Sequence, residues 1–476
     1  MEEIVPLKKL GDFHLEDSIN KILTIIKQKG DLFRTCDVVF GNKIDDPIYL
    51  NLIKEGIKLR FNSITQRLEL IEKNFSILDN ISSEIEYYYN NKLVFSNKNK
   101  EHIYYSSPDY KYINSIFGFS KVPKFINNSQ NILLPYDGIS FIFKNNPEEI
   151  ETNNIDSNCL LEKMLIFSES NLIDSINKDN SKLNFPSPLI KYSSDISDKI
   201  QMSFFKKNEN INITISLNET LVDLLDKLQN PNYIHSKNIN ENNSNNEEIN
   251  CYYFNYFDYG IDFVIDAEND DKIKKIILHS NNPFDSKFGI YEKCNFKLEM
   301  SAYYFKKNIN FSHDNLQLNN FKFSNITTDN QIEKNYSILN TDNLTINKNI
   351  KIIETKDNNS NNINNQNEKE IDNKLNYQKS VNLISSDFEI ITPNKNDKKQ
   401  IKEFNGVFQN ILIHPLINFT TDVLEKIPNT CYKVYQKYDN KINRTYKYYL
   451  FEGIIFEIME NNMISSIIIN SNQKQK

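Results

Sequence analysis

The stretch "YFDYGIDFVIDAENDDKIKKIILHSN", residues 256–281, contains two apolar segments joined by a turn rich in acidic residues and Asn. In the first segment Ile261, Phe263 and Ile265 alternate with Asp262, which is the period of two expected of a β-strand. The connecting residues "DAENDDK" tolerate turn geometry. The stretch therefore predicts an antiparallel hairpin.

The same pattern occurs three more times, as "YLNLIKEGIKLRFNSITQRLELI" at 49–71, "LLPYDGISFIF" at 133–143 and "YLFEGIIFEIMENNMISSIII" at 449–469. Each copy has Gly-Ile at the start of a strand, at Gly56, Gly138, Gly260 and Gly453. The chain has only 10 glycines in 476 residues, so a shared architectural requirement explains these four positions better than chance. We predict that they are structural glycines, which permit a bulge or a close backbone approach. Contact with a ligand is the alternative.

A short amphipathic helix is predicted before each hairpin. In the first helix, which ends at Gly30, Ile19, Ile22, Leu23 and Ile26 share one face. The others are predicted at 107–118 with a Ser cap, at 218–231 with an Asn cap and at 420–429. One helix and one hairpin are too small to bury an apolar face alone, so neighbouring units must pack together. These patterns predict an α+β fold of four tandem helix-plus-antiparallel-hairpin units packed together and interrupted by disordered Asn-rich inserts.

Asn-rich tracts indicate the boundaries between these units. Residues 236–250 contain seven Asn and residues 358–367 contain seven more, a composition with too little apolar surface to offset chain entropy. The predicted organisation is unit 1 at 1–75, unit 2 at 76–145, a connecting segment with a low-complexity part at 146–205, unit 3 at 206–300, a mostly disordered insert at 301–404 and unit 4 at 405–470.

Composition and motifs argue against several classes of protein. The net charge is −7 with no basic stripe, so no nucleic-acid partner is expected. Neither a signal peptide nor a transmembrane run is visible, and the five scattered Cys form no CxxC pair, which favours a cytoplasmic protein with free thiols. The six His are far apart, and no phosphate-binding or hydrolase motif occurs. We therefore expect no catalytic residues, no metal and no cofactor.

Three stretches resemble the phagosome assembly factor family, which was formerly known as an uncharacterised, lin-10-like family. They are "LNLIKEGIKLRFNSITQRLELIE", "YFNYFDYGIDFVIDAENDDKIKKIILHSNNPFDSKFGIYEKCNFKL" and "GIIFEIMENNMISSIII". The second is the most specific, because it carries the family pattern "LH-x-N-x-P … F-x-I-Y-x-x-C-x-F-K". The residues that match this pattern are His279, Asn281, Pro283, Phe288, Tyr291, Cys294 and Phe296.

The resemblance implies a non-enzymatic adaptor in autophagy. Such an adaptor would pair with a WD-repeat β-propeller protein of the breast-carcinoma-amplified-sequence type and gather at the phagophore assembly site. Contact with phosphoinositide membranes is expected through that complex. The alternative is a lipid- or small-ligand-binding factor in vesicle trafficking.

The seven pattern residues are the candidate partner-binding site. Aromatic residues beside a sheet edge suit a docking surface, and they equally suit a loop that closes the core. His279 and Cys294 could also form a nucleophile pair, although a strand-end His and a packed thiol are the more common use of these residue types.

Overall fold

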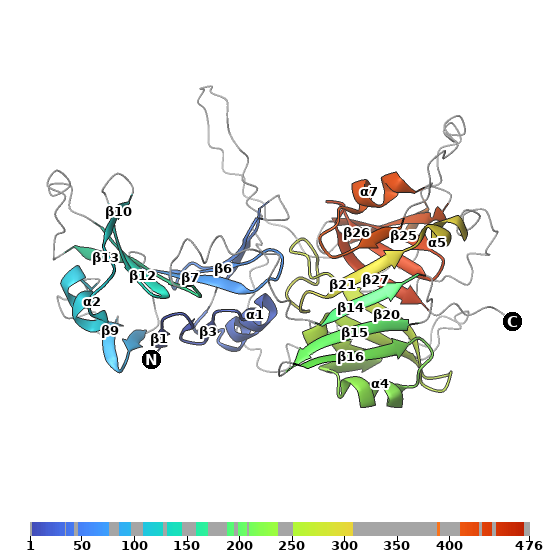
Figure 1. The fold of residues 1–476 in the computed structure, drawn as a ribbon, viewed down its shortest axis with the longest axis horizontal. Coiled ribbons are helices and arrows are strands. Elements are labelled where there is room, and N and C mark those ends of the chain that lie inside the picture. The colour runs from blue at the N-terminus through green and yellow to red at the C-terminus, as the bar shows by residue number, and fades with distance from the viewer. Residues whose placement is uncertain are drawn as a thin grey trace, which may run out of the picture.

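The protein is mostly β, as its computed structural model shows. The structure describes residues 2–33, 35–41, 46–75, 85–96, 108–126, 131–144, 159–169, 188–194, 199–206, 209–236, 251–307, 388–390, 410–427, 431–439 and 444–470. These residues form four sheets, of five, eight, five and nine strands. Two sheets belong to an N-terminal half and two to a C-terminal half, and the halves lie side by side (Figure 1).

The N-terminal half contains the eight-stranded sheet, in the order β10-β11-β12-β13-β7-β6-β5-β4. It consists of two antiparallel four-stranded meanders joined where β13 pairs with β7. The strands are β4 Asp37–Val39, β5 Ile48–Leu52, β6 Ile57–Phe61, β7 Leu68–Asn74, β10 Lys124–Ile126, β11 Asn131–Tyr136, β12 Ile139–Lys144 and β13 Leu160–Phe167.

The smaller N-terminal sheet has the order β3-β2-β1-β8-β9, with β1 and β8 parallel. Its strands are β1 Glu2–Val5, β2 Lys9–Leu10, β3 Phe13–His14, β8 Glu86–Tyr89 and β9 Lys92–Ser96. Two helices accompany these sheets, α1 at Ile19–Gln28 and α2 at Tyr110–Phe117. On α1, Ile19, Ile22 and Ile26 are buried, as the helical periodicity predicts.

The C-terminal half repeats this plan. Its nine-stranded sheet has the order β17-β18-β19-β20-β27-β26-β25-β24-β22, and its five-stranded sheet has the order β16-β15-β14-β21-β23 with β14 and β21 parallel. The larger sheet contains β17 Tyr233–Ser236, β18 Cys251–Tyr256, β19 Ile261–Asp266, β20 Lys272–His279, β22 Phe388–Ile390, β24 Lys433–Asp439, β25 Arg444–Phe451, β26 Ile454–Met459 and β27 Ile464–Asn470. The smaller contains β14 Leu189–Ser193, β15 Lys199–Lys206, β16 Glu209–Ser216, β21 Asn295–Met300 and β23 Ile411–Ile413. The helices are α4 Leu221–Leu228, α5 Ala302–Lys307 and α7 Phe419–Asp422, with single 3₁₀ turns η4 Phe257–Tyr259 and η8 Leu424–Lys426.

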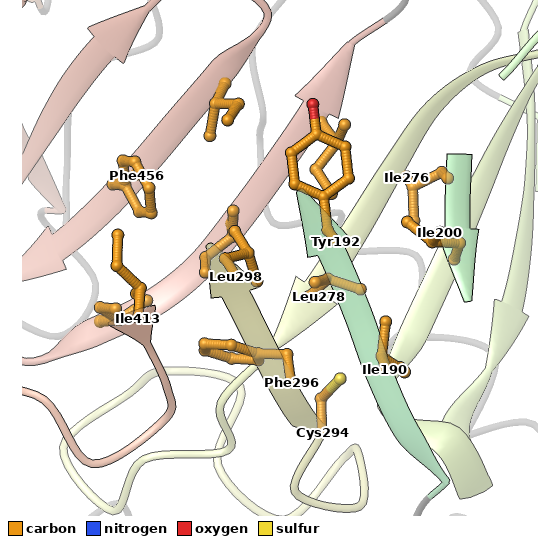
Figure 2. Close-up of a cluster of buried hydrophobic side chains, with 14 of the residues drawn as sticks. Ile190, Tyr192, Ile200, Ile276, Leu278, Cys294, Phe296, Leu298, Ile413 and Phe456 are labelled. Carbon is orange, nitrogen blue, oxygen red and sulfur yellow. The ribbon is translucent and has the colours of Figure 1, made fainter. Parts of the chain in front are cut away.

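The two C-terminal sheets pack face to face around an apolar core. Figure 2 shows Ile190 of β14 and Phe296 and Leu298 of β21 beside Leu278 of β20 and Phe456 of β26. All five side chains are fully buried. A comparable cluster of buried residues fills the N-terminal half.

The predicted α+β fold of helix-plus-hairpin units is wrong. Each expected hairpin belongs to a four-stranded meander, and the helices are only 4 to 10 residues long. The prediction fails because the strands of the smaller sheets, such as β1 and β14, pair with strands far away in the chain. Their partners, β8 and β21, begin 84 and 106 residues further on (from 2 to 86 and from 189 to 295), and a local pattern does not reveal such pairing.

The helix caps also differ from the predicted ones. Thr220, and not Asn218, caps α4, where its side chain and that of Asp223 form a capping box. Asp109 caps α2, whereas the predicted Ser cap at 107 lies outside the described residues. The predicted Asn-rich insert at 301–404 is described only at 301–307 and at Phe388–Ile390, which pairs with β24.

Candidate functional site

The four predicted structural glycines immediately precede β6, β12, β19 and β26 and have positive φ angles of +62°, +70°, +69° and +77° in chain order. Gly260 has the left-handed conformation, which side chains with a β-carbon adopt at a cost. A Cβ at Gly260 would lie 2.5 Å from the carbonyl oxygen of Glu292 and 2.8 Å from the amide nitrogen of Cys294. The close approach at Gly260 therefore positions the backbone of the candidate segment, residues 279–296.

A buried polar cluster anchors the start of this segment. His279, the last residue of β20, places Nε2 2.8 Å from Oδ2 of Asp262 on β19, and its ring stacks on Tyr291 with centroids 3.9 Å apart. The Tyr291 hydroxyl donates to the same Asp262 oxygen at 2.9 Å. The side-chain amide of Asn255 donates to the other oxygen of Asp262 at 2.7 Å. Both oxygens of the buried Asp262 carboxylate thus have hydrogen-bond partners within the chain, as is usual for buried polar groups.

The electrostatics of the cluster favour a charged Asp262. Burial alone would raise the pKa of this carboxyl, but the attraction of His279 and the hydrogen bonds from His279 and Asn255 lower it below its ordinary value. Burial raises the pKa of the neighbouring Cys294 thiol well above its ordinary value. A catalytic cysteine needs an accessible thiolate, so the geometry favours a packed thiol at Cys294 over a nucleophile.

The middle of the segment joins the two halves of the protein. The Asn281 side-chain amide donates to Oε1 of Gln66 at 2.6 Å, and the Gln66 side-chain amide donates back to the Asn281 carbonyl oxygen at 2.7 Å. Asn20 on α1 donates to the carbonyl oxygen of Ile290 at 2.9 Å. The hydroxyl of Ser18, the cap of α1, donates to Glu292. These contacts link residues more than 200 positions apart in the chain.

Apolar contacts reinforce this joint. Phe288 packs against the hydrophobic core cluster of the N-terminal half, although it belongs to the C-terminal half. The ring of Phe284 lies 4.5 Å from that of Phe40, which follows β4. Residues 279–296 therefore act as a joint between the halves, with polar and aromatic contacts on both sides.

The same segment is also attached to the C-terminal hairpin. The single hydroxyl hydrogen of Ser465 on β27 is shared between the carboxylates of Asp285 and Glu457. Glu457 on β26 also accepts from Tyr448 at 2.7 Å and from Ser466 at 2.6 Å. Burial and the nearby Glu457 raise the pKa of Asp285. The joint thus rests on β26 and β27 as well as on the N-terminal half.

The structure buries most of the predicted partner-binding residues. Exposed fractions are 4% for His279 and Asn281, 3% for Tyr291 and 0% for Cys294 and Phe296, whereas Pro283 and Phe288 are half-buried. This burial favours the role of a loop that closes the core over that of a docking surface. Within the segment, the turn at 283–287 is the part that a partner could reach directly.

The roles of several residues of the joint are not predicted from the sequence. Burial raises the pKa of Glu292 to about 7, and burial lowers the pKa of Lys293 to about 7. Lys293 extends to the carbonyl oxygen of Ser63 in the other half, 3.4 Å away. For Asp262 a signal existed, because a carboxylate inside the apolar run "GIDFVID" must either face solvent or find a partner. Nothing in the sequence marks Ser18 or Gln66.

In the described part of the chain, no group of three or more His, Cys, Asp or Glu side chains is arranged to hold a metal ion. Among its helices, none is long and apolar enough to cross a membrane.

Comparison with known proteins identifies one family over almost the whole chain. The family model described as Phagosome assembly factor 1 matches residues 9–470. A protein of Arabidopsis thaliana named as a PHAF1 protein is 43% identical over 51 residues, which is 11% of this chain and 12% of that relative. No solved structure matches the chain.

Proposed function

Because the chain belongs to the phagosome assembly factor 1 family, we propose that it is a non-enzymatic adaptor that acts in autophagy. In this proposal it binds a WD-repeat β-propeller protein and is recruited with that partner to phagophore assembly sites. The family match, which extends from residue 9 to residue 470, carries the proposal.

The architecture suits a binding platform. An adaptor needs a surface whose parts keep a fixed relation, because a flexible surface loses conformational entropy when it binds. Here the reciprocal amide pair of Gln66 and Asn281 is buried, with exposed fractions of 2% and 4%. A surface that includes residues of both halves is therefore already organised before a partner arrives.

We place the partner surface around the turn at 283–287. The guanidinium of Arg444, at the start of β25, lies 5.3 Å from the ring centroid of Phe284, and Phe40 of the N-terminal half packs on the same ring. All three side chains are half-buried, so part of each is accessible. Aromatic residues and Arg dominate the binding energy of protein interfaces. A partner bound here would contact both halves at once.

Affinity purification of the tagged full chain from fed and starved cells, followed by mass spectrometry, tests this function. A WD-repeat β-propeller protein should be among the specific partners. Arg444→Glu should reduce its recovery at least tenfold without loss of fold, because the substitution places a negative charge against Phe284 and removes the cation.

The matched control is Lys199→Glu, which reverses an exposed charge on β15, in the other C-terminal sheet. It should leave recovery of the partner unchanged. Absence of a WD-repeat protein under both conditions would contradict the adaptor proposal. Normal recovery with Arg444→Glu would show instead that the interface lies elsewhere.

A further inference from the structure

Two apolar side chains protrude from the loop that follows α2. Phe119 has an exposed fraction of 106% and Val122 of 80%, the two highest values among the exposed large hydrophobic residues in the described part of the chain. Isolated exposed apolar residues are common, but two on one short loop between Gly118 and Pro123 form a protruding apolar tip. We call residues 118–123 the tip loop.

The tip loop is held by a rigid base. The hydroxyl of Tyr136 on β11 bonds to the carbonyl oxygen of Gly118 and to the side chain of Asn114, both at 3.0 Å. The amide of Lys121 donates to the carbonyl oxygen of Pro135 at 3.1 Å. Phe117, the last residue of α2, packs its ring on Tyr89 with centroids 4.2 Å apart. The exposure of Phe119 and Val122 thus results from a loop fastened at both ends.

Two lysines lie in or directly after the tip loop, Lys121 and Lys124. From Tyr110 to Tyr136 the chain has three Lys and no Asp or Glu, although the whole protein has 63 acidic residues and a net charge of −7. The lysines, Lys111, Lys121 and Lys124, are all exposed. Lys121 belongs to the tip loop, where it pairs with Asp137, and Lys124 follows the loop directly. Lys111 lies in the first turn of α2 with the cap Asp109, at the helix end opposite the tip loop.

The position of the tip loop leaves it accessible to a large flat surface. Figure 1 shows α2, β9 and β10 at the end of the N-terminal half that lies furthest from the C-terminal half. A partner or membrane at this end would not meet the joint at 279–296. The tip and the proposed partner surface at Arg444 are therefore separate.

We propose that the tip loop binds directly to anionic lipid membranes, with Phe119 and Val122 inserted at the level of the headgroups and the lysines against lipid phosphates. A convex tip with an apolar point and basic flanks complements an anionic bilayer, in which apolar side chains enter the interface and each nearby lysine adds electrostatic attraction. A protein partner is the less favoured occupant, because aromatic anchors of protein interfaces are usually surrounded by other contact residues, whereas Phe119 is fully exposed among the described residues. This inference goes beyond the adaptor function, since it concerns the chain without its partner.

The chain contains no Trp, so Phe119→Trp gives a single-tryptophan reporter at the tip. The full-length variant is mixed with vesicles of phosphatidylserine and phosphatidylcholine, and separately with vesicles of phosphatidylcholine alone. The emission should shift to shorter wavelength with the anionic vesicles only, and brominated acyl chains should quench it. The control, Val222→Trp, places the reporter at a residue 66% exposed on α4 and should show neither effect.

Vesicle sedimentation measures how much the apolar side chains and the lysines each contribute to membrane affinity. Phe119→Ser with Val122→Ser should weaken binding to anionic vesicles about tenfold. Lys121→Gln with Lys124→Gln should weaken it by roughly five-fold per lysine, and added salt should weaken wild-type binding similarly. The control pair Val222→Ser and Tyr303→Ser, residues exposed by 66% and 70%, should have no effect.

Three results would overturn the proposal. Wild-type protein that fails to bind anionic vesicles excludes direct membrane contact. Equal binding to vesicles with and without phosphatidylserine would show that the lysines do not contribute to binding. Loss of partner recovery with Phe119→Ser and Val122→Ser, without any vesicle binding by wild type, would assign the tip loop to a protein interface. Because purified protein suffices for the vesicle assays, failure here is distinguishable from failure of the adaptor proposal.

Discussion

Replacement of Gly260 by Ala should destabilise the C-terminal half by about 1–4 kcal/mol. Gly260 has φ +69° and ψ +33°, a left-handed conformation that costs a residue with a β-carbon about 1 kcal/mol or more. The added Cβ would also lie 2.5 Å from the Glu292 carbonyl oxygen and 2.8 Å from the Cys294 amide nitrogen. Both are backbone atoms, so relief requires movement of the joint, and such overpacking costs about 1–3 kcal/mol. Reduced entropy of the unfolded chain returns about 0.4–1 kcal/mol.

Urea denaturation followed by far-UV circular dichroism measures this change as a shift of the unfolding midpoint. The control is Asp270→Ala, because Asp270 also has a positive φ, +53°, but lies in an exposed turn. Asp270 already has a β-carbon in the left-handed region, so alanine there adds neither that conformational cost nor crowding, and we expect a loss below about 1 kcal/mol. Equal stabilities for the two variants would refute the argument that the close approach of β19 to residues 292–294 requires glycine.

Other perturbations test the joint itself. Gln66→Ala and Asn281→Ala should show a coupling energy of about 1–3 kcal/mol in a double-mutant cycle, because each change removes the buried hydrogen bond between the two side chains and leaves its other partner unsatisfied. The bond from the Gln66 amide to the main-chain carbonyl of Asn281 is lost only with Gln66→Ala. A coupling near zero would contradict the side-chain hydrogen bond. Ser203→Ala, which breaks an exposed hydrogen bond to Asn212, serves as the control. Glu292 has a folded-state pKa of about 7 against an ordinary 4.5, so the folded state binds the extra proton, and stability should fall as the pH rises from 4.5 to 7, by on the order of 3 kcal/mol. Glu292→Gln should remove that part of the pH dependence, and an unchanged profile would show that the carboxyl is solvated.

The periodicity of the sequence predicts correctly the apolar face of α1 and the positions of the strands that follow the four glycines. The stripe of α1 includes Ile19, Ile22 and Ile26, all buried, because a helix of ten residues has one apolar face whatever lies opposite. Leu23, predicted on the same face, lies partly exposed at its edge and packs on the core from there. The strands that begin at Gly-Ile are also where the pattern predicts them, because alternating apolar and polar residues are typical of a β-strand with one buried face.

Long-range pairing could not be predicted in this way. The joining of two meanders through β20 and β27 depends on residues such as Ile277 and Ile468, and each reads as an ordinary buried strand residue. The joint was missed for the same reason. The sequence predicts His279 and Tyr291 as partner-binding residues, although aromatic and polar side chains beside a sheet edge equally suit a loop that closes the core. Their buried contacts with Asp262 favour the core-closing role. The predicted tract at 358–367 lies outside the described residues.

Hydrogen–deuterium exchange of the segment 280–296 tests most directly whether it is an internal joint. In the structure the amide of Gly289 donates to the Asn281 side chain, that of Glu292 to the Phe257 carbonyl and that of Cys294 to the His279 carbonyl. Amides bonded in this way exchange only when the joint opens. We therefore predict slow exchange across 280–296 in the protein alone, close to that of β20, with the proposed WD-repeat partner adding protection only at 283–287. Rapid exchange throughout 280–296 in the free protein, suppressed on addition of that proposed partner, would show that the segment is a docking loop and would contradict the account.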